Sequence, residues 1–147
     1  MASVLTNAFK ARLLGDDSQI STAVNLKSDT IKLMLVTSTY TPDIDADVFV
    51  STPDDNEVGA SGTYSAGGAT LTTTVTTDDT DDEGVFDATD VSFTSATITA
   101  RYAVVYKSTG VATTSPIVCV IDFGSNQSSS AGTFAITFAT EGIINLN

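Results

Sequence analysis

Apolar and polar residues alternate along most of this chain of 147 residues. Beyond Gly15 the apolar side chains recur mainly at every second position, which is the spacing of a strand with one face in the core. The run TIKLMLVTS is apolar on both faces except at Lys32, so we expect a central strand there. Strands are predicted over residues 31–36, 71–76, 85–86, 91–93, 98–106, 117–123 and 133–139, and in the C-terminal run IINLN.

Clusters of Gly, Pro, Asp and Ser separate these strands and predict turns. The clusters are TPDID, TPDDNE, SAGG, DDTDDEG, KSTG and GSNQSSSAG. Turns spaced about ten residues apart, with no alternation of strands and helices, are typical of antiparallel sandwiches and barrels. The sequence therefore predicts an all-β fold, an antiparallel β-sandwich or jelly-roll-like domain over residues 1–147.

The segment 1–15 is the one helical candidate and would form an N-terminal helical arm. Ser3 or Thr6 can cap its start, and Phe9 and Leu13, four residues apart, share one face. The glycine at its end supplies a left-handed stop. Two interpretations stay open: the helix lies across its own sheet, or it docks on a neighbouring subunit.

The net charge of −12 comes from the middle of the chain. Residues 33–100 hold thirteen acidic residues and no Lys or Arg, whereas the two flanks are nearly neutral. This excess of carboxylates argues against nucleic acid and anionic membranes as partners. No apolar stretch is long enough to span a bilayer or to form a signal peptide. Neutral or basic protein surfaces are the expected partners.

The usual catalytic residues are missing. The chain has no histidine and a single cysteine, which excludes Ser-His-Asp sites, Cys-His sites and cysteine zinc sites. No phosphate-binding glycine motif is present. A pair of carboxylates could hydrolyse a glycoside, but the chain lacks Trp and its acids lie in turns, so no enzyme is expected. Cys119, between two valines, is expected to be a buried, unreactive thiol.

Acidic turns are the one candidate for metal binding. Asp43, Asp45 and Asp47 alternate in a loop that follows a proline, and oxygen ligands at this density can bind Ca²⁺. The loop lacks the glycine and glutamate of an EF-hand. A second acidic run lies at residues 78–83. The alternative is a charged turn that prevents edge-to-edge sheet pairing, so no cofactor is expected apart from this weak calcium candidate.

Several stretches resemble a family of small structural proteins of tailed bacteriophages. They are ASVLTNAFKARLLG, DTIKLMLVTSTYTPDIDAD, YSAGGATLT, TITARYAVVYKSTG and SPIVCVIDFGSNQSSSAGTFAITFATEGIINL, which cover most of the chain. The resemblance implies a non-enzymatic virion protein, above all a capsid decoration (cement) protein on the outer capsid surface, made in the host cytoplasm. It supplies no catalytic residues.

The partner implied by this resemblance is the major capsid protein of the phage. Decoration sites lie on symmetry axes, so a homotrimer is expected. Removing residues 2–14 is expected to leave a folded domain that no longer binds capsids. The residues expected at the capsid interface are Leu5, Phe9, Lys10, Arg12 and Leu13. The alternatives are a tail or fibre-associated structural protein and a host-surface carbohydrate-binding module.

Overall fold

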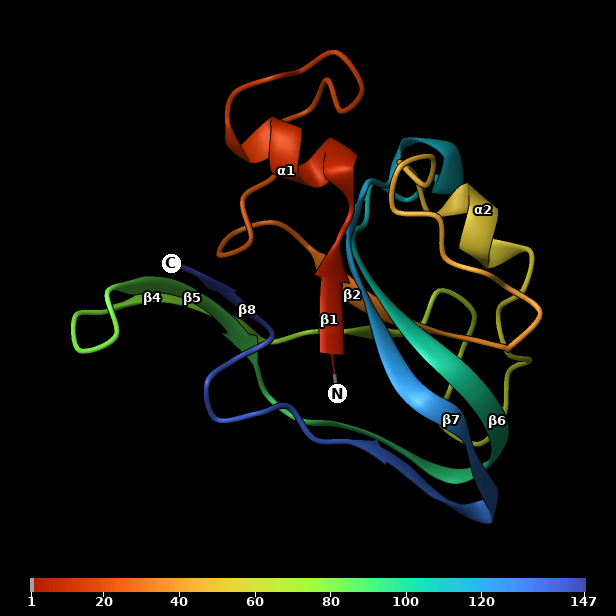
Figure 1. Cartoon of the computed structure of the whole chain (residues 1–147). Helices are drawn as coiled ribbons and strands as arrows, with labels where there is room; N and C mark the ends of the chain where they lie inside the picture. The colour runs from red at the N-terminus through yellow and green to blue at the C-terminus, as the bar shows by residue number, and fades with distance from the viewer. Residues whose placement is uncertain (1) are drawn as a thin grey trace.

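The computed structural model describes residues 2–147, which form two antiparallel β-sheets with short helices beside them (Figure 1). The elements are β1 (Ala2–Leu5), α1 (Asn7–Leu13), β2 (Ile31–Val36), α2 (Ser51–Asp54), β3 (Ala69–Thr70), β4 (Thr73–Asp78), β5 (Glu83–Ala88), β6 (Val91–Lys107), the 3-10 helix η1 (Ala112–Thr114), β7 (Ile117–Ile136) and β8 (Ile144–Leu146). The large sheet has the order β1-β7-β6-β2-β3, and the small sheet has the order β4-β5-β8. The prediction of an all-β fold is confirmed.

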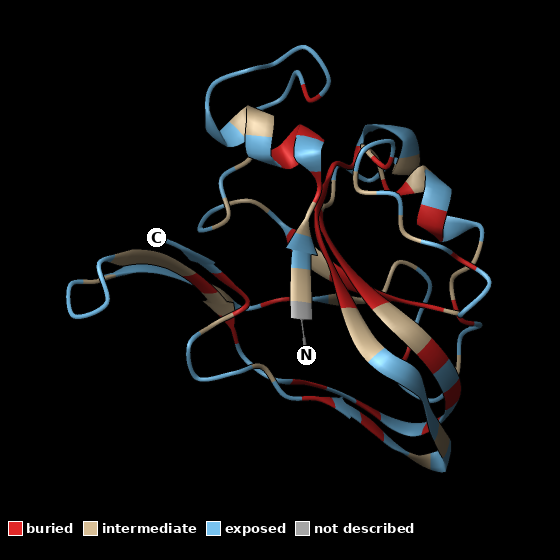
Figure 2. Ribbon diagram, viewed as in Figure 1, coloured by how far each residue is buried: buried red, intermediate tan, exposed pale blue. Residues whose placement is uncertain are grey.

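Strand β2 is buried on both faces, as its sequence predicts. Leu33 and Leu35 face the larger core, which the small sheet and α1 help to close. Met34 and Val36 face a second core on the opposite side, because alternate residues of a strand point to opposite faces. Tyr40, from the loop after β2, covers that second core. Figure 2 shows buried residues gathered where β2, β6 and β7 run together.

Strands β6 and β7 are longer than the sequence predicts. The short strands expected at 91–93 and 98–106 are one strand, and so are those expected at 117–123 and 133–139. The predicted turn GSNQSSSAG is therefore wrong, since this serine-rich run pairs with β6, for example Ser128 opposite Thr99. Ladder hydrogen bonds use only the backbone, so a run of small polar residues continues a strand when a partner lies beside it.

A bulge and a sharp bend shape this long ribbon. Gln127 lies opposite Ala100 but Asp122 lies opposite Tyr102, so residues 123–126 face Arg101 alone. The Arg101 guanidinium spans this bulge, with Nε 2.9 Å from an Asp122 carboxylate oxygen and a further contact to the Gly124 carbonyl oxygen.

Further along the ribbon, Ser95 and Ala131 have φ values of 53° and 48°. Both strands turn there together, as the lower right of Figure 1 shows, because bulges and left-handed residues bend a strand. The outer halves of β6 and β7 consequently run back toward the small sheet.

The small sheet confirms two predictions. The acidic cluster DDTDDEG is the turn between β4 and β5, whose pairing ends at Asp78 opposite Glu83. The C-terminal run is a paired strand, with Ile144 opposite Phe86. Both of these apolar side chains lie in the larger core. No helix among residues 2–147 has the length and apolar character that a bilayer span needs.

Candidate functional site

The N-terminal segment is a strand followed by a helix, so the helical arm predicted over residues 1–15 is only partly correct. Residues 2–5 form β1 and pair with β7. The helix begins after Thr6, whose hydroxyl oxygen accepts the Phe9 N–H at 3.3 Å. It ends at Leu13 with Leu14 as the C-cap, and Gly15 follows with φ 100°. The cap and the stop lie where the sequence places them.

This segment packs on its own chain. Phe9 is fully buried in the larger core, and half-buried Leu5 packs against that core. The Thr6 hydroxyl donates to the Ile117 carbonyl oxygen at 3.2 Å, and the Ser3 hydroxyl donates to the Ile143 carbonyl oxygen at 2.5 Å. Contrary to the prediction from the sequence, we therefore expect that removing residues 2–14 would open the core and leave one edge of β7 without its partner strand.

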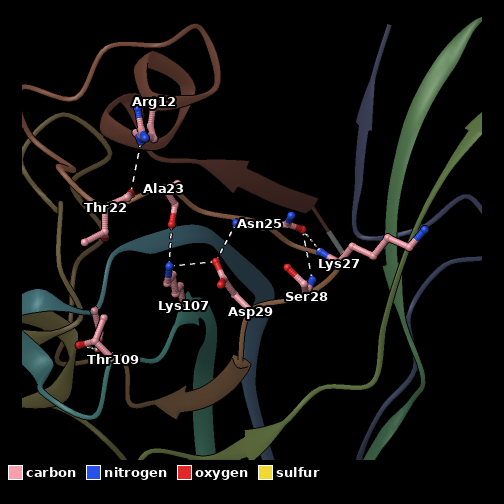
Figure 3. Close-up of polar contacts among 10 residues, drawn as sticks. Arg12, Thr22, Ala23, Asn25, Lys27, Ser28, Asp29, Lys107 and Thr109 are labelled. Carbon is pink, nitrogen blue, oxygen red and sulfur yellow. Dashed lines mark hydrogen bonds and ion pairs between the residues drawn. The ribbon is translucent and has the colours of Figure 1, made fainter.

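Only part of the predicted interface remains accessible. Phe9 belongs to the fold and offers no surface to a partner, whereas Lys10 and Leu13 are exposed and Arg12 is half-buried. The Arg12 Nε donates to the Thr22 carbonyl oxygen at 3.3 Å, as Figure 3 shows. The structure thus leaves Lys10, Arg12 and Leu13 accessible, and Leu13 lies one turn after Phe9 on the same face of α1.

An apolar groove of about 540 Å³ lies between α1, the segment 23–27 and the small sheet. Val75, Phe86 and Ile144 lie opposite one another in the small sheet and share a face, and Leu146 follows on that face two residues later. Phe86 and Ile144 are buried in the core, but Val75 and Leu146 lie beyond its edge and are exposed. The groove exists because this apolar face continues past the point where the core ends.

One basic residue, Lys27, lines the groove opposite the small sheet. Its side chain extends from the loop toward β4 and β5 (Figure 3). Within residues 2–147, no carboxylate lies within ion-pair distance of the Lys27 ammonium group, whereas the Lys107 ammonium group lies 2.9 Å from Asp29. That ion pair, together with the Lys107 hydrogen bond to the Ala23 carbonyl oxygen, holds the loop 23–29 in place.

Asp29 is adapted to this anchoring role. Burial opposes its ionisation, but the Asn25 N–H at 2.7 Å and the Lys107 ammonium together lower the pKa of the Asp29 carboxyl. The carboxylate is therefore charged at neutral pH and tethers the loop on both sides. Sequence analysis missed the groove residues Lys27, Val75 and Leu146, because their proximity depends on how the sheets pack.

A second surface carries no charge at all. Residues 91–100 and 123–140, which are the outer half of the β6–β7 ribbon and the four residues after it, contain no Asp, Glu, Lys or Arg, and the Asp90 carboxylate borders them by accepting the Phe138 N–H. A hollow of about 440 Å³ opens on it, lined by Phe123, Gln127, Ser128 and Thr133 among others. We call these two ranges the charge-free ribbon. In a chain with 24 charged residues, such a continuous neutral surface is a candidate contact region.

The carboxylates of the three predicted calcium ligands already accept hydrogen bonds from other groups of the chain. The buried Asp47 carboxylate accepts the Tyr40 hydroxyl at 2.6 Å and the Asp43 N–H at 2.9 Å. Asp43 accepts the Asp45 N–H at 3.0 Å, and Asp45 accepts the Asn7 side-chain amide at 2.5 Å. Across residues 2–147, no group of three or more such side chains is placed to hold a metal ion. In this structure the carboxylates of Asp43 and Asp47 order the turn itself.

Cys119 lies fully buried on β7, as predicted. Burial raises the pKa of its thiol to about 12. The thiolate is the reactive form of cysteine, so this position offers no nucleophile near neutral pH.

Comparison with known proteins identifies no relative: no protein-family model, no curated protein and no solved structure matches the chain. The resemblance to phage structural proteins remains a prediction from the sequence.

Proposed function

We propose that the chain is a non-enzymatic decoration (cement) protein of a tailed bacteriophage, which binds the outer surface of the assembled capsid. Binding to the assembled lattice alone would stabilise it by mass action, without chemistry. Two things support this proposal: the resemblance of most of the sequence to phage structural proteins, and the charge-free ribbon.

The charge-free ribbon is the observation that carries the proposal. The cores of protein interfaces are depleted in charged residues, and hydroxyl and amide groups supply hydrogen bonds that need no ion pair. A chain with a net charge of −12 would be repelled by other acidic surfaces unless it approached through a neutral region. The ribbon provides that region, and its hollow would receive a protruding loop of the capsid protein.

The proposed location is the outer capsid surface, after synthesis in the host cytoplasm. A cryo-EM map of the particle whose genome encodes this chain would test it directly. Ordered density on the outer capsid, with the ribbon facing the lattice, is the expected result. Density confined to the tail would replace the proposal with a tail or fibre role, and absence from the particle would overturn both.

A binding assay would test the surface itself. Gln127→Lys and Thr133→Lys introduce a charge at exposed positions beside the hollow, and we expect each to weaken binding to undecorated capsids at least about tenfold. Thr113→Lys is the matched control, because Thr113 is also exposed but lies on η1, at the opposite end of the β6–β7 ribbon. Equal binding by all three variants would exclude the ribbon as the contact surface.

The hollow also gives a specific reason to retain the carbohydrate-binding alternative. Phe123 supplies an aromatic ring beside the amide of Gln127 and the hydroxyls of Ser128 and Thr133, which together could contact a sugar. Binding to host cell-surface glycans that Thr133→Lys abolishes, with no capsid binding, would favour that function over decoration.

A further inference from the structure

We propose that the open edge of β7 in the charge-free ribbon binds an extended, uncharged segment of the capsid protein, which adds to the sheet as a further strand. This contact is part of the proposed function, on which the inference rests. The recognising group is the main chain of β7, and its side chains only select which segment fits.

The outer half of the ribbon has two edges, and the chain covers the edge along β6. The Thr63 N–H donates to the Thr94 carbonyl oxygen at 3.1 Å. The Thr94 N–H in turn donates to the Thr63 hydroxyl oxygen at 2.9 Å, and the Thr97 N–H donates to the Ser61 hydroxyl oxygen at 2.9 Å. The loop that holds Ser61 and Thr63 therefore occupies the place of a neighbouring strand.

The edge along β7 has no such cover. Its partner β1 begins at Ala2, opposite Asp122, and so reaches only the inner half of β7. Within residues 2–147, no backbone group of residues 127–136 pairs with a strand other than β6. Every second residue of an edge strand points its N–H and C=O away from its partner. These groups form a row to which another strand can bind.

The hollow of about 440 Å³ lies along this open edge. All of the residues that line it belong to β7, and none belongs to β6. They include the four successive residues from Thr133 to Ile136. Successive side chains of a strand point to opposite faces, so a hollow that touches all four lies beside the strand and not on one face of it. The space next to the outward-pointing backbone groups is therefore open.

This edge lacks the side chains that usually protect an open strand. Lysines, prolines and inward-pointing charges prevent most edge strands from pairing with other chains. Residues 123–136 contain no proline and no charged residue. By contrast, β4 at the edge of the small sheet ends at Asp78 and leads into the acidic turn. Of these two edges, the one along β7 is therefore the better suited to accept a strand.

The shape of the edge selects a segment of another protein over a second copy. β7 bends at Ala131, and the hollow is lined by Gln127 and Ser128 before the bend and by residues 133–136 after it. A two-fold contact sets the same patch of both copies face to face, so two hollows would leave a gap between them. A hollow instead fits a protruding segment. Each arm of the edge beside the bend can pair with a short strand of about four residues.

The lack of charge selects the composition of that segment. A charged side chain placed against residues 127–136 would lose its water without gaining an ion pair. The net charge of −12 would in addition repel an acidic segment. Main-chain hydrogen bonds and the hydroxyls of the ribbon supply the contacts that remain. We therefore expect a capsid segment of small polar and apolar residues.

Replacing single amides of β7 by esters would test recognition by the main chain, because an ester removes one N–H and keeps the side chain. Cys119 is the only cysteine, so a synthetic segment 119–147 can be ligated to residues 1–118 to give the full chain. The N–H groups of successive residues point to opposite sides of a strand. An ester at Ala135 therefore removes a donor on one side of β7, and esters at Phe134 and Ile136 remove donors on the other.

Each refolded chain would be assayed for binding to undecorated capsids of the phage whose genome encodes it. We expect esters on the open side to weaken binding about three- to tenfold and to leave the thermal midpoint nearly unchanged. Esters on the β6 side should lower the midpoint and leave the binding of the folded chain unchanged. The all-amide chain made by the same ligation is the control, and circular dichroism would verify that every chain is folded.

The outcomes separate this inference from the proposed function. Unchanged binding by all three esters, together with weaker binding by Gln127→Lys or Thr133→Lys, would overturn the inference and keep the proposed function, because side chains would then make the contact. A dimer of the free chain that the esters dissociate would assign the edge to a second copy and also overturn the inference. If the all-amide chain binds no capsid, the proposed function falls and the inference falls with it.

Discussion

The hydroxyl of Tyr64 donates to Oε1 of Glu57 at 2.6 Å and accepts the Leu35 N–H at 2.9 Å. The same carboxylate oxygen accepts the Gly67 N–H at 2.7 Å, so Glu57 orders the SAGG turn against the central strand β2. Burial raises the pKa of Glu57 above its usual range, and the hydrogen bonds from Tyr64 and Gly67 offset only part of that effect. Glu57 is thus a half-buried structural acid, although its sequence neighbourhood is an acidic loop.

Glu57→Gln should keep the fold, because the amide oxygen still accepts from both Tyr64 and Gly67. We expect the free energy of unfolding at pH 7 to stay equal or to rise by up to about 1 kcal/mol, since a half-buried charge is removed. Glu57→Ala leaves both donors without a partner and should lower it by about 1–3 kcal/mol. Urea unfolding of both variants would check this, and equal losses would show that the charge itself is needed.

The raised pKa of Glu57 also predicts a pH dependence. The folded chain holds the Glu57 proton more tightly than the unfolded chain, so this contribution to stability is complete below the usual carboxyl pKa of 4.5. It is lost as the pH rises through the raised value. The free energy of unfolding of the wild type, measured relative to that of Glu57→Gln, should therefore increase as the pH is lowered from about 8 to 4. A constant difference in urea unfolding free energy over that range would contradict the prediction.

Three glycine-to-alanine variants should separate the cost of a left-handed backbone conformation from the cost of steric overlap by the added Cβ. Gly68 has φ +70°, and a Cβ there would overlap the Leu33 carbonyl group, so Gly68→Ala should cost at least about 2 kcal/mol. Gly110 has φ +85° with open space around it, and Gly110→Ala should cost about 1 kcal/mol. Gly59→Ala, with neither constraint, should fall within about 0.5 kcal/mol of wild type. Thermal unfolding would show whether the three rank in this order.

The N-terminal helix should contribute strongly to stability. Phe9→Ala removes a fully buried ring from the larger core and should lower the free energy of unfolding by about 3–5 kcal/mol. Leu13→Ala, one turn later on the same face but 45% exposed, should change it by less than about 0.5 kcal/mol. Similar small effects for both residues would mean that α1 is a detachable arm after all.

Calcium should not stabilise the chain. The carboxylates of Asp43, Asp45 and Asp47 already accept hydrogen bonds from separate partners, so the thermal midpoint should shift by less than about 1 °C with excess calcium or chelator. Tyr40→Phe removes the hydroxyl that donates a hydrogen bond to the Asp47 carboxylate, and should lower the free energy of unfolding by about 1–2 kcal/mol. A saturable rise of the midpoint with calcium would restore the metal interpretation.

Local patterns account for most of what could be predicted. The alternation through Leu33 and Leu35 indicates a strand buried on both faces, and Thr6 with Gly15 marks the ends of the helix. The acidic turn between β4 and β5 follows from its composition. Each of these features depends on side chains and backbone preferences within a few residues, which is why the sequence suffices for them.

By itself, then, the sequence determined the all-β class, most of the strands, the N-terminal cap and the uncharged composition of the ribbon. Only the tertiary structure decided that the serine-rich run continues β7, that Phe9 is core, and that Val75 and Leu146 share a groove with Leu13. These outcomes depend on strand register and sheet packing. Both are set by contacts between residues far apart in the chain, which no local pattern specifies.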